Sequence, residues 1–229
     1  MVTIVCYTAF VVYASWSVFS GTNVFYDPYV SPFFSTWLGF GLIQVPIIGL
    51  LIPILAVIPL GLRGSCYYYR KSYFRSFFWD PPACAIQELK RGRYHGETRF
   101  PWVLNNYHRY FLILSLVVVV FLWVDVARAF FTQGHFFIGL GTVVMIVNVI
   151  LLTLYSITCH SFRYLMGGRI DSYSRVRLGK LWQRATMALD RMNPMHGAWA
   201  WYSMFSVALT DVYIRLLMAG VIHEPRWIL

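Results

Sequence analysis

Five long apolar runs divide this 229-residue chain and constrain its fold more than any other feature. A helix that crosses the hydrocarbon core of a bilayer needs roughly 20 mostly apolar residues. The chain is 59% hydrophobic and only 12% charged, whereas soluble domains are typically about 25% charged. The sequence therefore predicts an all-α membrane protein with five transmembrane helices, folded as a single integral membrane domain over 1–229. The predicted spans lie at about 2–20, 37–60, 107–128, 136–159 and 197–221.

Lysine and arginine are concentrated in two of the connections between these runs. The segment 61–106 holds eight and the segment 160–196 holds seven, while the connections 21–36 and 129–135 hold none. Positively charged connections stay on the cytoplasmic side of a membrane. The pattern predicts a multi-pass protein with a cytoplasmic N-terminus and with 61–106 and 160–196 as cytoplasmic segments. In a chain this apolar, the excess of cations indicates membrane orientation and excludes nucleic-acid binding.

Both cytoplasmic segments interleave cations with aromatic or apolar residues. The stretch 67–79 reads YYYRKSYFRSFFW, and the stretch 174–192 has apolar residues at helical spacing. Such patterns are typical of amphipathic helices that lie in the lipid headgroup region. They predict amphipathic interfacial segments on the cytoplasmic side, although a docking surface for a soluble partner has the same pattern.

Two cysteines and two histidines are predicted to meet at the cytoplasmic end of the spans. His108 and His160 each lie 26 residues from Gly134, the tip of the hairpin between the third and fourth runs, so two antiparallel helices bring them to the same depth. Cys66 follows the second run on the same side, and Cys84 follows a double proline. Two thiolates with two imidazoles suit either tetrahedral zinc or a Rieske-type [2Fe-2S] cluster.

Three alternatives to this ligand set stay open. Cys159 is another candidate thiol, but it adjoins His160, and neighbours on a helix point about 100° apart, which disfavours both binding one metal. Haem b with His108 and His160 as axial ligands is a second redox interpretation, which leaves Cys66 and Cys84 without a role. A zinc-binding or metal-free membrane scaffold is an alternative of a different class.

Several strings within 63–217 resemble a known family, the cytochrome b-like, haem-free membrane-anchor subunit of actinobacterial-type succinate dehydrogenase or fumarate reductase. The strings are CYYYRKSYFRSFFWDPPACA, GETRFPWVLNNYHRYF, LGTVVMIVNVILLTLYSITCHSFRYL and SVALTDVYI. Family members often have a CHSCRH-like string where this chain has CHSFRY. Phe162 and Tyr164 therefore cannot serve as ligands here.

The resemblance implies a subunit that is not catalytic alone and completes a succinate:quinone oxidoreductase in the bacterial plasma (inner) membrane. The implied partners are a flavoprotein subunit, an iron-sulfur subunit, membrane lipids and quinone, in a complex that can form a higher oligomer. It also implies a Rieske-type [2Fe-2S] cluster held by Cys66, Cys84, His108 and His160, with haem b as the alternative cofactor. Candidate quinone-binding residues are the polar and aromatic side chains Tyr68, Arg70, Lys71, Tyr73 and Trp79.

Overall fold

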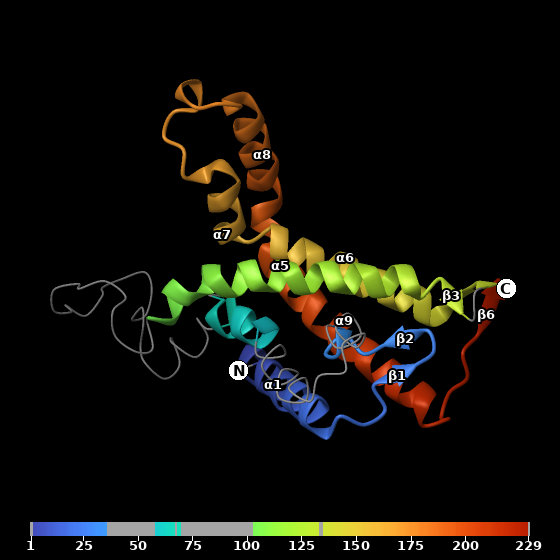
Figure 1. The fold of residues 1–229 in the computed structure, drawn as a ribbon. Coiled ribbons are helices and arrows are strands. Elements are labelled where there is room, and N and C mark those ends of the chain that lie inside the picture. The colour runs from blue at the N-terminus through green and yellow to red at the C-terminus, as the bar shows by residue number, and fades with distance from the viewer. Residues whose placement is uncertain (1, 36–57, 67, 70–102, 133–134, 229) are drawn as a thin grey trace, which may run out of the picture.

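The computed structural model describes residues 2–35, 58–66, 68–69, 103–132 and 135–228, which are mostly helical (Figure 1). Four long helices form a bundle, and a short helical segment at 58–65 packs among them. The long helices are α1 (Val2–Ser20), α5 (Leu104–Arg128), α6 (Leu140–Ile157) and α9 (His196–Met218).

Three of the described helices are long and apolar enough to cross a membrane. They are Val2–Ser20, Tyr107–Arg128 and Leu140–Ile157, and they match the first, third and fourth predicted runs. Helix α9 takes the place of the fifth run and is 23 residues long, but it carries buried polar side chains such as Thr210 and Asp211. The second run, 37–60, lies mostly outside the described residues. The prediction of a mostly helical fold is thus confirmed, and three of its helices could span a membrane.

The bundle has two ends of different character. We call the end that carries Arg63, His108 and His196 the basic end, and the opposite end, where short strands pair, the hairpin end. Helix α6 contacts both α5 and α9. Buried side chains form one apolar cluster toward each end. The cluster at the basic end includes Phe10, Leu62, Leu112, Tyr155 and Met204, and that at the hairpin end includes Tyr29, Leu122, Phe137, Val149 and Ile214.

Short antiparallel strand pairs close the hairpin end. β1 pairs with β2, β3 with β4, and β5 with β6. Because residues 135–139 pair as strands, α6 begins at Leu140, four residues later than the predicted span at 136–159. The strands are β1 (Phe25–Tyr26), β2 (Tyr29–Val30), β3 (Phe131–Thr132), β4 (His135–Phe136), β5 (Ile138–Gly139) and β6 (Arg226–Ile228).

Asp211 of α9 connects α1 and the following loop to α9. Its carboxylate is fully buried and accepts hydrogen bonds from the Tyr13 hydroxyl (2.5 Å) and the Ser17 hydroxyl (3.1 Å) of α1. The Ser31 hydroxyl donates to the other carboxylate oxygen, and Arg215 Nε donates over 2.8 Å. A buried carboxylate is costly unless it is paired and hydrogen-bonded, and this one is both.

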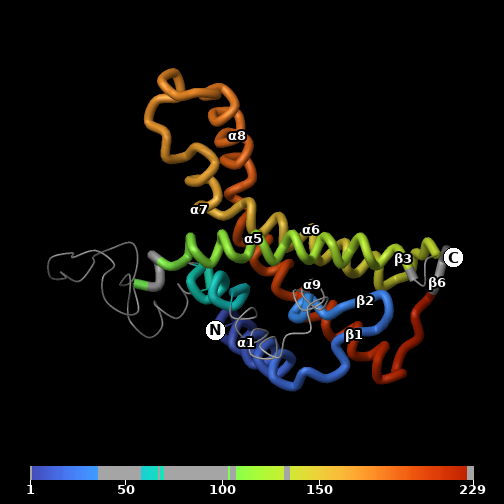
Figure 2. Tube along the Cα trace, viewed as in Figure 1, coloured from blue at the N-terminus to red at the C-terminus, as the bar shows by residue number. Residues whose placement is uncertain are grey.

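Residues 160–195 leave the bundle as an arm. Figures 1 and 2 show the arm projecting crosswise to α5 and α6 near the basic end. Helix α8 bears out the prediction of a helix within 174–192, since Gly179, Thr186 and Leu189 are buried on one side and the other side is exposed. The arm comprises α7 (His160–Arg163), η1 (Tyr164–Gly168), η2 (Tyr173–Arg175), α8 (Gly179–Met192) and η3 (Asn193–Met195).

Candidate functional site

His108 on α5 connects two other segments at the basic end. Its Nδ1 lies 2.9 Å from the Ser65 hydroxyl, and its Nε2 lies 3.2 Å from Cys159 Sγ. Ser65 ends the helical segment 58–65, and Cys159 follows the last residue of α6 by two positions. The three side chains bring the second, third and fourth predicted runs together at one point.

The hydrogen bonds of Ser65 define the tautomer of His108. The Ser65 hydroxyl has one proton and donates it to the Gly61 carbonyl, 2.6 Å away. It must therefore accept at its contact with His108, which makes Nδ1 the protonated ring nitrogen. The lone pair of Nε2 then faces the Cys159 thiol. An imidazole nitrogen held this way can accept a proton from a thiol or ligate a metal.

Of the three described cysteines, Cys66 and Cys159 are buried and Cys6 is half-buried. Cys66 is 2% exposed and Cys159 is 4% exposed. Burial raises the pKa of the Cys66 thiol, an effect that the neighbouring Tyr155 hydroxyl and the Arg63 charge partly oppose. A thiol in this environment stays protonated at neutral pH unless a metal replaces its proton.

His160 and His196 have opposite environments. His160 begins α7 and is exposed. His196 begins α9 and is only 3% exposed; its Nδ1 lies 3.0 Å from the Thr158 hydroxyl. Its ring stacks on Tyr155, with centroids 5.1 Å apart and an interplanar angle of 7°, and the edge of Tyr68 closes its other side. His196 is therefore a packed interior side chain.

Arg63 is a buried cation at the same end, 3% exposed. Its Nη1 donates to the Tyr69 hydroxyl (2.7 Å) and the Ala200 carbonyl (3.1 Å), and its Nη2 donates to Ser203 (3.0 Å). Its guanidinium carbon lies 4.8 Å from the centre of the Tyr155 ring. Among the described residues it has no carboxylate partner, so neutral dipoles and π-systems alone offset its charge.

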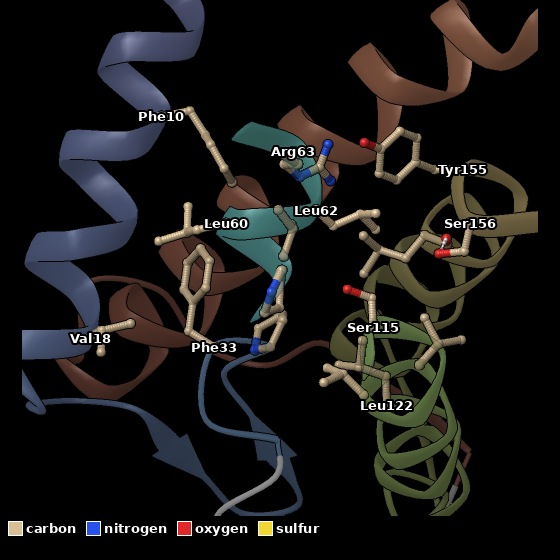
Figure 3. Close-up of a pocket in the computed structure, with 16 residues that line it drawn as sticks. Phe10, Val18, Phe33, Leu60, Leu62, Arg63, Ser115, Leu122, Tyr155 and Ser156 are labelled. Carbon is tan, nitrogen blue, oxygen red and sulfur yellow. Dashed lines mark hydrogen bonds between the residues drawn. The ribbon is translucent and has the colours of Figure 1, made fainter. Parts of the chain in front are cut away.

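A cavity of about 60 Å³ lies beside Arg63, between α1, the segment 58–65, α5 and α6 (Figure 3). Its wall is largely apolar but includes the hydroxyls of Ser115, Tyr155 and Ser156. The Ser115 and Tyr155 hydroxyls are buried without a nitrogen or oxygen partner among the described residues. The volume suffices for a few water molecules, which such hydroxyls require.

The predicted four-ligand metal set lies partly outside the described residues, because Cys84 is outside them. Of the other three predicted ligands, His108 contacts Cys159 rather than another predicted ligand, and His160 is exposed. The described ranges hold no group of three or more His, Cys, Asp or Glu side chains arranged around one point. The described residues thus bring together a Cys-His pair, and the four-ligand set stays a prediction.

Of the five candidate quinone residues, only Tyr68 lies within the described residues. It is half-buried, packs edge-on against the His196 ring at 5.3 Å between centroids, and leaves no room for a side chain at Gly197. It thus borders the polar cluster. The other candidates, Arg70, Lys71, Tyr73 and Trp79, lie outside the described residues.

Sequence reasoning missed Arg63, Ser65 and His196 as members of this cluster. Arg63 is one of the eight cations of the connection 61–106. Its only sequence signal is its place at the end of the apolar run 37–60, where it continues the helical repeat of that run. Ser65 sits next to Cys66, yet a serine at a helix end carries no signal of its own. His196 precedes an apolar run, and nothing in the pattern distinguishes a buried histidine there from an exposed one.

Comparison with known proteins assigns the chain to a family. The family model described as actinobacterial succinate dehydrogenase subunit SdhC matches residues 1–220. A chain of the solved structure titled Mycobacterium smegmatis Sdh1 complex in the apo form superposes with a TM-score of 0.79; it is 32% identical, and the match covers 99% of this chain and 89% of that chain. None of the curated proteins compared matches this chain. The chain belongs to the actinobacterial succinate dehydrogenase SdhC family and is a membrane subunit of that complex.

Proposed function

We propose that this SdhC subunit anchors succinate dehydrogenase in the plasma membrane, docks its iron-sulfur subunit on the basic end and passes electrons to quinone there. Family membership supports the enzyme class. The observation that carries the residue-level proposal is the basic end itself, where a buried arginine lies near a histidine-cysteine pair.

The proposed topology has five spans, with the N-terminus and the basic end in the cytoplasm. Three described helices are apolar enough to cross a bilayer. Helix α9 has the length required, since 23 residues rise by about 34 Å, and it packs along α6. The span at 37–60 rests on the sequence. This arrangement places both lysine- and arginine-rich connections on the same side of the membrane.

Arg63 has a direct electrostatic consequence for electron transfer. A unit charge about 10 Å from a redox group, at an effective dielectric constant of about 20, changes its energy by roughly 1.7 kcal/mol. A buried cation without a carboxylate partner among the described residues therefore favours an added electron nearby. The same charge also stabilises the negative oxygen of a quinone as it is reduced.

The Rieske-type cluster with Cys66, Cys84, His108 and His160 stays a prediction. Two features support a metal at the basic end: the Nε2 lone pair of His108 points at a thiol, and Cys66 is buried close by in the same apolar cluster. A [2Fe-2S] cluster, if bound, supplies one-electron transfer. The chain's own residues would hold it and exclude water from it. The exposed position of His160 is the feature that fits this ligand set least.

Purification of the tagged chain from its native membranes tests the proposal. We expect flavin and iron to co-purify with the chain, together with succinate:quinone reductase activity that disappears when the chain is deleted. A chain that purifies alone with zinc and without iron would support the membrane-scaffold alternative. Quinone reduction that persists in membranes lacking the chain would contradict the proposal.

A further inference from the structure

The arm is a fixed hairpin rather than a loose loop. The Tyr173 hydroxyl donates to the Gly167 carbonyl (3.0 Å) and lies 3.2 Å from the Thr186 hydroxyl of α8. Gly167 has a φ of +109°, in a region that favours glycine, where it packs beside Thr186. At the surface, Arg163 of α7 forms a bidentate ion pair with Asp190 of α8. These contacts hold α8 against the rest of the arm.

The exposed side of α8 carries a cationic stripe with apolar flanks. Lys180, Arg184 and Arg191 are exposed and fall within about 40° of one another around the helix axis. Beside this stripe, Leu181 is 59% exposed and Met187 is 50% exposed. Large apolar side chains that flank a row of cations on one helix are the pattern of a helix that lies at a lipid interface.

The position of α8 within the arm decides the direction in which its cationic face points. Because Gly179, Thr186 and Leu189 pack inward against the rest of the arm, the cationic stripe points the other way. Figure 1 shows α8 on the side of the arm nearer the hairpin end and α7 on the far side. If α5 and α6 span the bilayer, an arm crosswise to them at the basic end runs along the membrane plane, and α8 is the helix nearer the lipid.

We propose that this face of α8 binds the surface of an anionic phospholipid bilayer. Leu181 and Met187 enter the boundary between headgroups and acyl chains, and Lys180, Arg184 and Arg191 contact the phosphates. This combination of apolar and cationic residues is the signature of an interfacial helix. A soluble acidic partner would use the cations but would leave the orientation of α8 toward the bilayer unexplained. The inference rests on the proposed membrane topology.

Photocrosslinking identifies what covers this face. The photoreactive amino acid p-benzoylphenylalanine, introduced at Leu181 in the full chain within its native membranes, is expected to form phospholipid adducts detectable by mass spectrometry. Tyr164 provides a matched control, because it is 51% exposed on the other limb of the arm, in η1 next to α7. At Tyr164 we expect at least fivefold fewer lipid adducts. Crosslinks from Leu181 to another subunit or to a second copy of the chain, or equal lipid yields at both positions, would overturn the proposal.

A second experiment tests the preference for anionic lipid. The complex is reconstituted in vesicles containing equal amounts of phosphatidylglycerol and phosphatidylcholine, then re-extracted, and the retained lipids are quantified. The triple variant Lys180→Gln, Arg184→Gln, Arg191→Gln is expected to retain at least fivefold less phosphatidylglycerol, because each such cation contributes severalfold to binding an anionic surface. The charge-conserving variant Lys180→Arg, Arg184→Lys, Arg191→Lys should retain it. Equal retention by both variants would contradict the proposal. An unmodified complex without succinate:quinone activity would instead contradict the proposed function.

Discussion

His108 Nε2 lies 3.2 Å from Cys159 Sγ, although the two residues are 51 positions apart in the chain. The contact joins the start of α5 to the residue that links α6 to the arm. Because Nδ1 is the protonated nitrogen, through its hydrogen bond to Ser65, the pair is oriented with an imidazole lone pair toward sulfur. This orientation suits the pair to bind a metal.

The cofactor prediction is tested by low-temperature EPR of the dithionite-reduced complex, together with its optical spectrum. We expect the rhombic signal of a histidine-ligated [2Fe-2S] cluster, and we expect it to be lost in His108→Ala and in Cys66→Ser. His223→Ala, which alters an exposed histidine at the hairpin end, should leave the signal intact. Sharp haem bands without such a signal would instead make the histidines axial ligands.

The same spectra distinguish the two candidate thiols. With Cys66 and Cys84 as the thiolate ligands, Cys159→Ser should keep the cluster signal, because only the hydrogen-bond partner of His108 changes. Loss of the signal in Cys159→Ser and its survival in Cys84→Ser would instead place Cys159 in the ligand set. Iron analysis of each variant separates loss of the cluster from a change in its spectrum.

Replacing Asp211 should destabilise the subunit strongly. Asp211→Ala removes the acceptor of three hydroxyl donors and leaves Arg215 without its carboxylate partner. Breaking a buried ion pair from one side costs about 3–5 kcal/mol. A thermal unfolding series in detergent measures the effect through the loss of the folded monodisperse protein.

Asp190→Ala is the matched control for this experiment. The Arg163–Asp190 pair is exposed, and exposed ion pairs contribute little to stability. The hydrogen bond from Arg163 lowers the pKa of the Asp190 carboxyl, so the pair persists at neutral pH and is lost only as the pH falls through that lowered pKa. Unfolding midpoints that drop equally for both variants would contradict the assigned role of Asp211.

The arm should loosen when Gly179 acquires a side chain. A Cβ at this position would collide with the Tyr173 carbonyl, which belongs to the backbone and cannot rotate away. Overpacking of this kind typically costs about 1–3 kcal/mol. Hydrogen exchange should therefore speed up in Gly179→Ala for the amides of α8 and leave those of α6 unchanged. Unchanged protection of α8 would show that the hairpin is not held by this contact, and Ala188→Ser, exposed on the same helix, serves as the control.

The hydrophobic pattern predicted most of the described helices, because the length and apolarity of a run determine where such a helix forms. Helix α1 has the predicted bounds, and α5 and α9 end within three residues of theirs. The start of α6 was misplaced because β4 pairs with β3 in a local hairpin and β5 pairs with the distant strand β6, and both pairings override the local apolar run. A partner strand as far away in the sequence as β6 leaves no local periodicity.

The site was harder to predict, because a backbone break decides it. The prediction that His108 and His160 lie at the same depth treats the chain through Cys159 and His160 as one continuous helix. In the structure α6 ends at Ile157, and Cys159 is extended, with φ −66° and ψ 138°. The break turns the Cys159 side chain toward α5 and leaves His160 exposed. No glycine or proline marks this break in the sequence.

Arg63→Met tests most directly the claim that the basic end passes electrons to quinone. Tyr69 and Ser203 still donate to the Ala200 carbonyl in this variant, and no described carboxylate loses a partner when Arg63 is replaced, so the subunit should fold and assemble. Succinate oxidation is measured on the purified complex twice, once with an artificial dye that accepts electrons from the soluble subunits and once with quinone. We predict unchanged dye reduction and at least tenfold slower quinone reduction, as expected for the loss of roughly 1.7 kcal/mol of electrostatic stabilisation. Quinone reduction at the rate of the unmodified complex, with dye reduction also unchanged, would contradict the account.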